Sequence, residues 1–281
     1  MKFGVLMFAT DTGVPIDEIA RAVEERGFES LWIPEHQHIP VDRVTPYTYA
    51  EDGVMPDMYW HTHDPFVALT WAAAATTHLK LGTGICLISQ RDPIATAKQV
   101  ASLDRYANGR FLFGVGAGWL AEEIEATGTP FASRWQVSAE RMAAMKQIWT
   151  QDEPEYHGAF VDLPKTRIFP KPQQRPHPPV YIGATSAYSR QRVIDWEVDG
   201  WLPHIEAKHD LIGGATDLRD RAARAGRDPD SIRISVISDL PNAVDLCEQA
   251  AAERCIAIIP QAPAATVMAE LDRLAKRIPG G

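Results

Sequence analysis

The stretch PEHQH, residues 34–38, places two acid–base side chains next to each other. A histidine such as His36 can donate or accept a proton near neutral pH, while Glu35 can orient the ring or carry charge. A lone histidine in a loop usually lies on the surface or packs against neighbouring side chains, without a catalytic role. This one follows a strand-like segment and precedes a long loop, where barrel enzymes build their sites. We therefore predict that His36 is a catalytic proton donor or acceptor and that Glu35 is its catalytic partner.

A metal centre is a second interpretation of the same region. Two H-x-H pairs occur there: His36 and His38, then His61 and His63. Together with Asp64 they are ligand types that a metal-dependent barrel hydrolase uses. Such a centre draws further ligands from later strands, where His204 is the one candidate at a strand end. The set is incomplete, so we predict no metal site and keep the hydrolase as an alternative.

The stretch GATS, between a strand-like and a helix-like segment, is a candidate anion site. Backbone N–H groups at the positive end of the helix, with two hydroxyl groups, can hold a phosphate. The four residues are Gly183, Ala184, Thr185 and Ser186. Arg190 and Arg192 on the following helix can add positive charge. The simpler alternative, that Thr185 or Ser186 only caps the helix, stays open.

The glycine-rich stretch FGVGAGW has part of the pattern of a dinucleotide-binding turn. Its glycines, Gly114, Gly116 and Gly118, are spaced G-x-G-x-G, whereas that turn requires G-x-G-x-x-G. The turn also requires an acidic residue about 20 positions later, at the end of a second strand. Residues 133–149 have helical periodicity instead. The sequence therefore disfavours a dinucleotide-binding domain.

Strand-like and helix-like segments alternate along the chain, and these elements must position the residues above. Short apolar runs predict eight strands: 2–8, 30–34, 79–88, 110–116, 179–183, 199–203, 232–238 and 254–260. A helix-like segment follows each strand; one begins with Asp92 as cap and Pro93 in its first turn. This order is typical of a parallel (β/α)8 barrel. We therefore predict an α/β fold, with residues 1–281 forming a single TIM-barrel domain.

Two connections are longer than plain barrel loops and are predicted to be insertions. Residues 37–63 follow the second strand, and residues 151–178 precede the fifth. The first insertion lies at the carboxyl ends of the strands, where barrel active sites are built. Four of its aromatic side chains are candidates for an apolar cover over a flat ring, or else pack the loop down: Tyr47, Tyr49, Tyr59 and Trp60.

Composition disfavours several classes of function. The chain has 281 residues, 45% of them hydrophobic and 23% charged, which suits an ordinary globular protein. Its formal net charge of -9 disfavours a nucleic-acid partner, which needs a basic surface. No apolar stretch approaches the roughly 20 residues that span a bilayer, so no membrane partner is expected. The three cysteines form no C-x-x-C pair, which favours a reduced, cytoplasmic location.

Three stretches resemble the bacterial luciferase-like flavin and deazaflavin oxidoreductases, the luciferase-like monooxygenase family, and in particular the branch that uses the deazaflavin coenzyme F420. They are SLWIPEHQHIP, the segment from LKLGTGICLISQ to EATGTPFASR, and IFPKPQQRPHPPVYIGATS leading into VDGWLPH. They cover most of residues 1–204 in the family's order. The resemblance implies a TIM barrel, a flat ring-shaped cofactor and a redox reaction.

The resemblance also implies where the cofactor would bind. A non-proline cis peptide bond behind the ring would fall at Gly84–Ile85. Gly116, Ala117 and Gly118 would leave room for the ring, so that FGVGAGW belongs to a cofactor bed. The phosphate loop of the family would fall on Gly183–Ser186, in agreement with the anion site above.

For the substrate, the resemblance implies a departure from one group of relatives. Those that act on sugar phosphates have a histidine after strand two, which His36 matches, and a glutamate after strand four. Trp119 stands at the second position. We therefore expect a more apolar substrate pocket, with Trp119 and Trp60 as its walls.

The predicted function is a luciferase-like oxidoreductase that transfers a hydride between coenzyme F420 and a small organic substrate. An FMN-dependent monooxygenase on the same fold is the nearest alternative, because both rings are flat and carry a phosphate. A cofactor-binding protein without turnover is another, since fold does not guarantee activity. Homodimerisation is expected from the resemblance.

Overall fold

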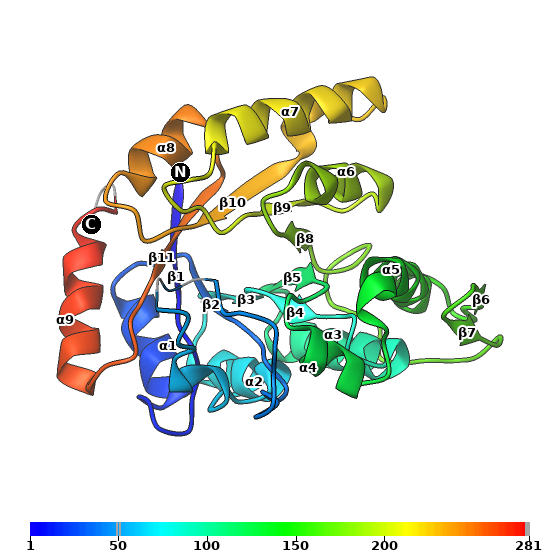
Figure 1. Cartoon of the computed structure of the whole chain (residues 1–281), viewed down its shortest axis with the longest axis horizontal. Helices are drawn as coiled ribbons and strands as arrows, with labels where there is room; N and C mark the ends of the chain where they lie inside the picture. Colours follow the sequence, from blue (N-terminus) through cyan, green and yellow to red (C-terminus); the bar gives the residue numbers. More distant parts are fainter. Residues whose placement is uncertain (49, 51, 279–281) are drawn as a thin grey trace.

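The computed structural model describes residues 1–48, 50 and 52–278, and contains a closed barrel of parallel strands surrounded by helices (Figure 1). The barrel strands are β1 (Lys2–Leu6), β2 (Ser30–Ile33), β3 (Lys80–Thr83), β5 (Phe111–Gly116), β8 (Val180–Gly183), β9 (Gly200–Leu202), β10 (Arg233–Ile237) and β11 (Arg254–Ile258). β1 pairs with both β2 and β11, and β3 pairs with β5, which closes the cylinder. The predicted (β/α)8 barrel is confirmed.

The third predicted strand, residues 79–88, is divided in two. β3 ends at Thr83, and a short strand, β4 (Cys86–Leu87), continues beside β5. The peptide bond between Gly84 and Ile85 is cis, as the family resemblance implied. Ile85 therefore lies at the carboxyl ends of the strands, where a barrel active site is expected.

Side chains fill the interior of the barrel. The interior cluster consists of Leu6, Trp32, Leu112, Tyr181, Leu202, Ile237 and Ile256. The opposite faces of the same strands pack against the helices in a larger apolar cluster. Because both faces of the sheet are covered, β5 is buried at every residue. This double burial is the reason that the strands are nearly continuous apolar runs in the sequence.

The helices are α1 (Ile16–Glu25), α2 (Pro65–Ala75), α3 (Pro93–Tyr106), α4 (Ala121–Ala126), α5 (Arg134–Thr150), α6 (Ala187–Asp195), α7 (Leu211–Arg224), α8 (Ala243–Gln249) and α9 (Ala264–Ala275). Asp92 accepts a hydrogen bond from the Ala95 N–H at 2.7 Å, and Pro93 begins α3, which confirms the predicted start. Asp64 caps α2 in the same way. In the described part of the chain, no helix has the length and apolar character to cross a bilayer.

The two insertions lie in different parts of the molecule. Residues 37–63 adjoin the barrel mouth, where the Thr62 hydroxyl donates to the His36 carbonyl at 2.8 Å. Residues 151–178 carry a hairpin of β6 (Tyr156–His157) and β7 (Asp162–Leu163) at the edge of the molecule in Figure 1. The Glu140 carboxylate of α5 holds this hairpin by accepting hydrogen bonds from three backbone N–H groups: those of Ala159, Phe160 and Val161. The first insertion, residues 37–63, lies next to His36 and is called the lid below.

The replacement Gly114→Ala is expected to destabilise the barrel by about 3 kcal/mol, at the upper end of overpacking costs. A Cβ atom at this position in β5 would lie 2.1 Å from the Thr83 carbonyl oxygen, and backbone cannot rotate away as a side chain can. The measurement is the midpoint of urea denaturation, followed by circular dichroism. An unchanged midpoint would contradict the close approach of β3 and β5.

Candidate active site

His36 and Glu123 form a buried pair at the carboxyl ends of the strands. The His36 Nδ1 atom lies 2.9 Å from Glu123 Oε2, and the two side chains are 7% and 1% exposed. Glu123 Oε1 also accepts a hydrogen bond from the Gln37 N–H at 3.0 Å. An ionised carboxylate only accepts hydrogen bonds, so Nδ1 carries a hydrogen and Nε2 is left to exchange a proton with another group.

Glu35 has a different partner from the one that we predicted. Its carboxylate accepts hydrogen bonds from Arg91 Nε at 2.6 Å and from the Leu87 N–H at 2.8 Å. Residues 34–36 follow β2 without regular secondary structure, and the hydrogen bonds of Glu35 and His36 lead to different parts of the barrel mouth. Glu35 therefore turns toward the loop after β4, and His36 turns toward α4. The prediction that Glu35 partners His36 is corrected: Glu123 is the partner, and Glu35 binds Arg91.

Glu123 was not predicted, although the sequence contains a signal for it. It stands in the stretch WLAEEIEATG, where two adjacent acids follow the fourth barrel strand and begin α4. Acidic residues are common in the first turn of a helix, because they interact favourably with its dipole. That ordinary role conceals the contact with His36, which lies 87 positions earlier.

Aromatic side chains surround the His36 ring. The ring centroids of His36 and Tyr59 are 5.0 Å apart, and those of His36 and Trp119 are 6.1 Å apart with an interplanar angle of 76°. The Tyr47 hydroxyl donates to the Tyr59 hydroxyl at 3.1 Å. The lid thus brings Tyr59 to the histidine and Tyr47 to Tyr59, and Trp119 lies beside them; its role as a pocket wall stays a prediction. Tyr49 lies outside the described residues.

Trp60 is not part of this aromatic group. Its side chain is 51% exposed, and among the described residues its ring lies near that of His61, with the centroids 6.4 Å apart. Tyr59 ends a short 3-10 helix, η1 (Asp57–Tyr59), in which successive side chains diverge by about 120° because there are three residues per turn. Tyr59 therefore points toward His36 while Trp60 points toward solvent. Tyr59, not Trp60, is thus the described residue of this turn that contacts the His36 ring, and the role of Trp60 as a substrate wall stays a prediction.

Glu122, the neighbour of Glu123, holds the lid. Its Oε1 atom accepts hydrogen bonds from the backbone N–H groups of Val44 at 2.6 Å and Thr45 at 2.9 Å. Burial opposes ionisation, but hydrogen bonds from Thr45, from Glu122 itself and from Val44 outweigh it and lower the pKa of this carboxyl to about 2. The ionised form is therefore the one that holds the lid.

This depressed pKa predicts a pH dependence of stability. The carboxyl of Glu122 titrates near 4.5 in the unfolded chain and near 2 in the folded one. Its stabilising contribution is therefore complete above pH 4.5 and is lost as the pH falls toward 2. The variant Glu122→Gln should be less stable than the natural sequence at pH 7, and the difference should shrink below pH 4.5. Urea denaturation of both proteins across this range measures it, and a pH-independent difference would contradict the assignment.

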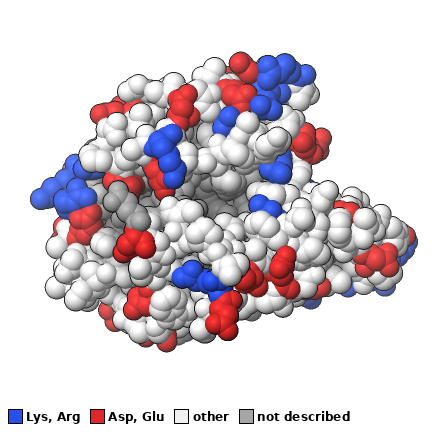
Figure 2. Space-filling model, in the orientation of Figure 1, with Lys and Arg blue, Asp and Glu red and all other residues white. Residues whose placement is uncertain are grey.

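Two glycines of the predicted cofactor bed, Gly116 and Gly183, lie against Ile85. A Cβ atom at Gly116 would lie 2.1 Å from Ile85 Cδ1, and one at Gly183 would lie 2.9 Å from Ile85 Cγ2. The absent side chains at Gly116 and Gly183 thus make room for Ile85, and Gly118 adopts a positive φ of 75°. Figure 2 shows that the molecule is hollowed near its centre, over the region where Figure 1 labels β5 and β8. A flat ring can lie on such an apolar floor.

The predicted anion site lies at the start of α6. Ser186 caps this helix by accepting a hydrogen bond from the Ser189 N–H at 3.2 Å. The cap uses one of the four N–H groups that a helix start leaves without intrahelical partners. No acidic residue stands in the first turn to offset the positive end of the helix dipole. The first turn of α6 therefore still fits a phosphate.

Neighbouring side chains shape the same region. The Arg190 guanidinium donates to the Thr185 carbonyl at 2.9 Å and to Asp217 at 2.6 Å, so it supports the loop and is already paired. Arg192 lies over the Trp135 ring at 3.9 Å. His209 Nε2 is 3.4 Å from the Thr185 hydroxyl. Arg190 and His209 thus contact the loop at Thr185, whereas the Arg192 guanidinium lies against Trp135.

The histidines of the two H-x-H pairs do not converge. His36 pairs with Glu123, and His61 Nδ1 lies 2.7 Å from Asp11. Burial lowers the pKa of His204, although the carboxylate of Glu206 is near, so this ring is neutral at pH 7. Across residues 1–48, 50 and 52–278, no group of three or more His, Cys, Asp or Glu side chains is arranged to hold a metal ion. The metal-hydrolase alternative gains no support.

Sequence comparisons relate this chain to known proteins. The family described as luciferase-like monooxygenase matches residues 1–278. An uncharacterised protein of Mycobacterium tuberculosis is 37% identical over 229 residues, which are 81% of this chain and 80% of that protein. The FMNH2-dependent dimethylsulfone monooxygenase of Pseudomonas putida is 35% identical over 159 residues, which are 54% of this chain and 42% of that protein.

Solved structures with distant sequences share the fold. The monooxygenase RslO1 from Streptomyces bottropensis has a TM-score of 0.77 at 19% identity, with 99% of this chain and 98% of that chain covered. The coenzyme F420 dependent tetrahydromethanopterin reductase from Methanopyrus kandleri has a TM-score of 0.72 at 18% identity, with 96% of each chain covered. Together with the match over residues 1–278, these findings show that the chain belongs to the luciferase-like monooxygenase family.

Proposed function

We propose that this protein is an oxidoreductase that transfers a hydride between coenzyme F420 and a small organic substrate. The observation that carries the proposal is the buried pair of His36 and Glu123, with Nδ1 and Oε2 2.9 Å apart. Hydride transfer to a carbonyl group requires that a proton be added to the substrate oxygen, and hydride transfer from an alcohol requires that one be removed. A histidine with one nitrogen held by a carboxylate can perform that transfer through its other nitrogen.

The residues around Ile85 and the start of α6 fit a deazaflavin or a flavin. The apolar Ile85, beside Gly116 and Gly183, would support one face of the ring, and the uncompensated start of α6 would hold a phosphate. His209, whose Nε2 atom lies 3.4 Å from the Thr185 hydroxyl, would add a hydrogen-bonding group near that phosphate. When bound, the cofactor would supply or accept the hydride. The protein's own contribution is then binding, orientation and proton transfer.

The lid would exclude water from the reaction. Tyr47 and Tyr59 pack against each other, and Tyr59 contacts the His36 ring. Glu122 holds the lid backbone in this position. Removing water strengthens the electrostatic interactions in a site and limits side reactions. Trp119 would form an apolar wall for the substrate, which favours a substrate without a phosphate group.

The first test is a titration of the purified protein with oxidised coenzyme F420 and, in parallel, with FMN, following the fluorescence of each ring. We expect tighter binding of the deazaflavin, followed by its reduction or reoxidation when a panel of alcohols, ketones and imines is added. If the protein binds neither ring, the proposed function is wrong, and the family relationship indicates only the fold.

The FMN-dependent monooxygenase is the second candidate, because a relative that is 35% identical over part of this chain is named as FMNH2-dependent. FMN differs from the deazaflavin in reacting with oxygen when reduced. Preferential binding of FMN, with substrate-dependent oxygen consumption, would favour this candidate. Oxygen consumption measured with an electrode would separate the two reactions.

We also propose that the protein is a homodimer in the cytoplasm. On α2, Val67 and Trp71 are one turn apart and are 69% and 61% exposed, which is a large apolar surface for one helix. The three cysteines are free thiols, which suits a reducing compartment. The variant Trp71→Glu is expected to shift the protein from dimer to monomer in sedimentation velocity. A monomeric natural protein would remove the dimer from the proposal.

A further inference from the structure

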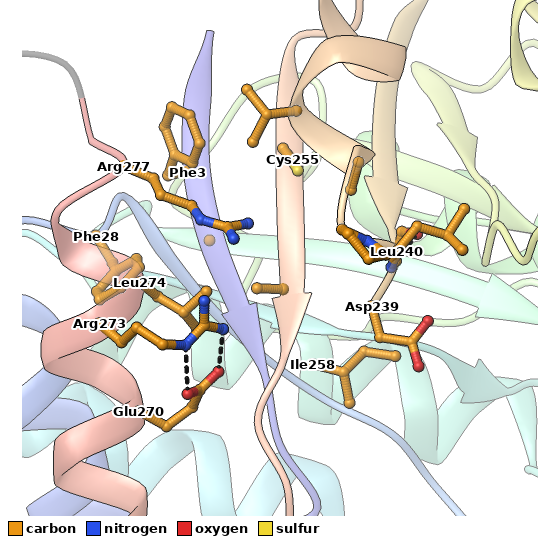
Figure 3. A pocket seen from close by; sticks show the side chains of 16 residues that line it. Phe3, Phe28, Asp239, Leu240, Cys255, Ile258, Glu270, Arg273, Leu274 and Arg277 are labelled. Carbon is orange, nitrogen blue, oxygen red and sulfur yellow. Dashed lines mark hydrogen bonds and ion pairs between the residues drawn. The ribbon is translucent and has the colours of Figure 1, made fainter.

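A cavity of 310 Å³ lies between α8 and α9, on the outer side of the barrel (Figure 3). The helix α8 has 7 residues, against 14 in α7 and 12 in α9. It is therefore too short to cover the whole flank of β11. None of the residues that line the cavity belongs to the cofactor bed or contacts His36. The cavity is separate from the candidate active site.

The floor of the cavity is formed by small side chains of β11. Ile256 points into the barrel interior, so its neighbours Cys255 and Ala257 point outward, toward the helical layer. Neither side chain is large enough to fill the space that α8 leaves open. The walls are apolar and come from β1, α9, the loop after β10 and α8: Phe3, Leu274, Leu240 and Val244. The cavity thus suits a compact apolar group.

Charged side chains stand at its rim. Arg273 is neutralised by Glu270, with Nε and Oε2 2.7 Å apart. Arg277, one turn later, makes no side-chain hydrogen bond or salt bridge with any residue that the structure describes. Figure 3 shows its guanidinium extending across the cavity toward Cys255, with Asp239 on the opposite side. Arg277 feels the charge of Glu270 but is hydrogen-bonded to no described side chain, so its guanidinium can bind a ligand above the small side chains of the cavity floor.

We propose that this cavity binds a small monocarboxylate with an apolar body. The body would lie on Cys255 and Ala257, and the carboxylate would bind the Arg277 guanidinium, whose planar fork matches a carboxylate. The carboxylates of Asp239 and Glu270 at the rim disfavour an anion with two charges, such as a phosphate monoester. The volume is at the lower end of ligand pockets, about 300 to 1,000 Å³, so the ligand is compact.

The first test uses octanoate, octan-1-ol, octylamine and octyl phosphate as probes, titrated calorimetrically into the full-length protein without cofactor. Octanoate is expected to bind at least tenfold more tightly than the alcohol and the amine, and more tightly than the phosphate. Equal binding of octanoate and octan-1-ol would overturn the role of Arg277. No binding of octanoate at millimolar concentration would overturn the site.

Two variants locate the binding. Arg277→Gln is expected to weaken octanoate binding about tenfold, whereas Lys276→Gln, the same charge loss one residue earlier and outside the cavity, should leave it unchanged. Ala257→Phe should fill the floor and abolish binding. Equal effects of the two charge changes would indicate general attraction by the surface and would contradict the proposal.

Thiol labelling provides a measurement that needs no variant. Cys255 lines the cavity, whereas Cys86 and Cys247 do not line it and are fully buried. A hydrogen bond with Cys247 and the charge of Arg277 lower the pKa of the Cys255 thiol. A lower pKa favours the thiolate, which is the form that reacts with maleimide. Octanoate should slow maleimide modification of Cys255, identified by peptide mass spectrometry, at least fivefold. An unchanged rate at saturating octanoate would place the bound probe elsewhere.

Discussion

Turnover about 10²- to 10⁴-fold slower than that of the natural sequence, with nearly unchanged affinity for the cofactor, is expected when His36 is replaced by asparagine. The asparagine amide can still donate a hydrogen bond to Glu123, so the buried carboxylate keeps a partner. The variant has no group in place of Nε2 that can exchange a proton near neutral pH. The substitution should therefore slow the chemical step rather than weaken cofactor binding.

Single-turnover absorbance of the cofactor ring measures that step, and a fluorescence titration measures the affinity. A variant with lost turnover and lost cofactor binding would assign His36 to the cofactor bed. A variant with equal turnover would remove it from the mechanism. Either result would leave the fold and the family unaffected, because neither depends on this side chain.

Glu123→Gln is expected to slow the same step by roughly 10- to 100-fold, by analogy with other carboxylates that orient a catalytic histidine. The glutamine amide can donate to Nδ1, which moves the ring hydrogen to Nε2 and exchanges its donor and acceptor nitrogens. Glu123 is thus a positioning residue that acts through His36. The pH profile of turnover and the ¹⁵N chemical shifts of the His36 ring would both report the altered tautomer.

Glu122→Gln is the matched control for this variant. It makes the same chemical change one residue away, on the same turn of α4, but its carboxylate contacts the lid backbone rather than the ring. We expect Glu122→Gln to affect stability and substrate affinity, and to leave the His36 tautomer unchanged. Identical ring spectra for the natural protein and Glu123→Gln would contradict the positioning role.

The barrel could be predicted from the sequence because each strand is buried on both faces. Because of that burial every strand is a short apolar run in the sequence. Such a run can be recognised from a few neighbouring residues, without knowledge of the rest of the fold. The cap at Asp92 and the start of α3 were predictable for the same reason, since they depend on neighbouring residues. His36 was found by its position after a strand, which is again a local feature.

The partners of His36 could not be predicted in the same way. Glu35 is adjacent in sequence, yet its carboxylate is bound by Arg91 and by the Leu87 N–H, not by His36. Glu123 is brought to the ring by the closure of the barrel, over a separation of 87 residues. Whether Tyr59 or Trp60 faces His36 depends on one short helical turn. A shift of one residue in that turn would turn Trp60 toward the site and Tyr59 toward solvent.

The consecutive carboxylates of Glu122 and Glu123 divide the lid into separately supported parts. Glu123 holds the chain at Gln37, and Glu122 holds it again at Val44. Residues 38–43 between these points carry neither attachment, so loops of different length and composition can be grafted there while the histidine keeps its support. Under the proposed function, substrate range and proton transfer would then be supported separately, and directed evolution of residues 38–43 is expected to change the first without loss of the second.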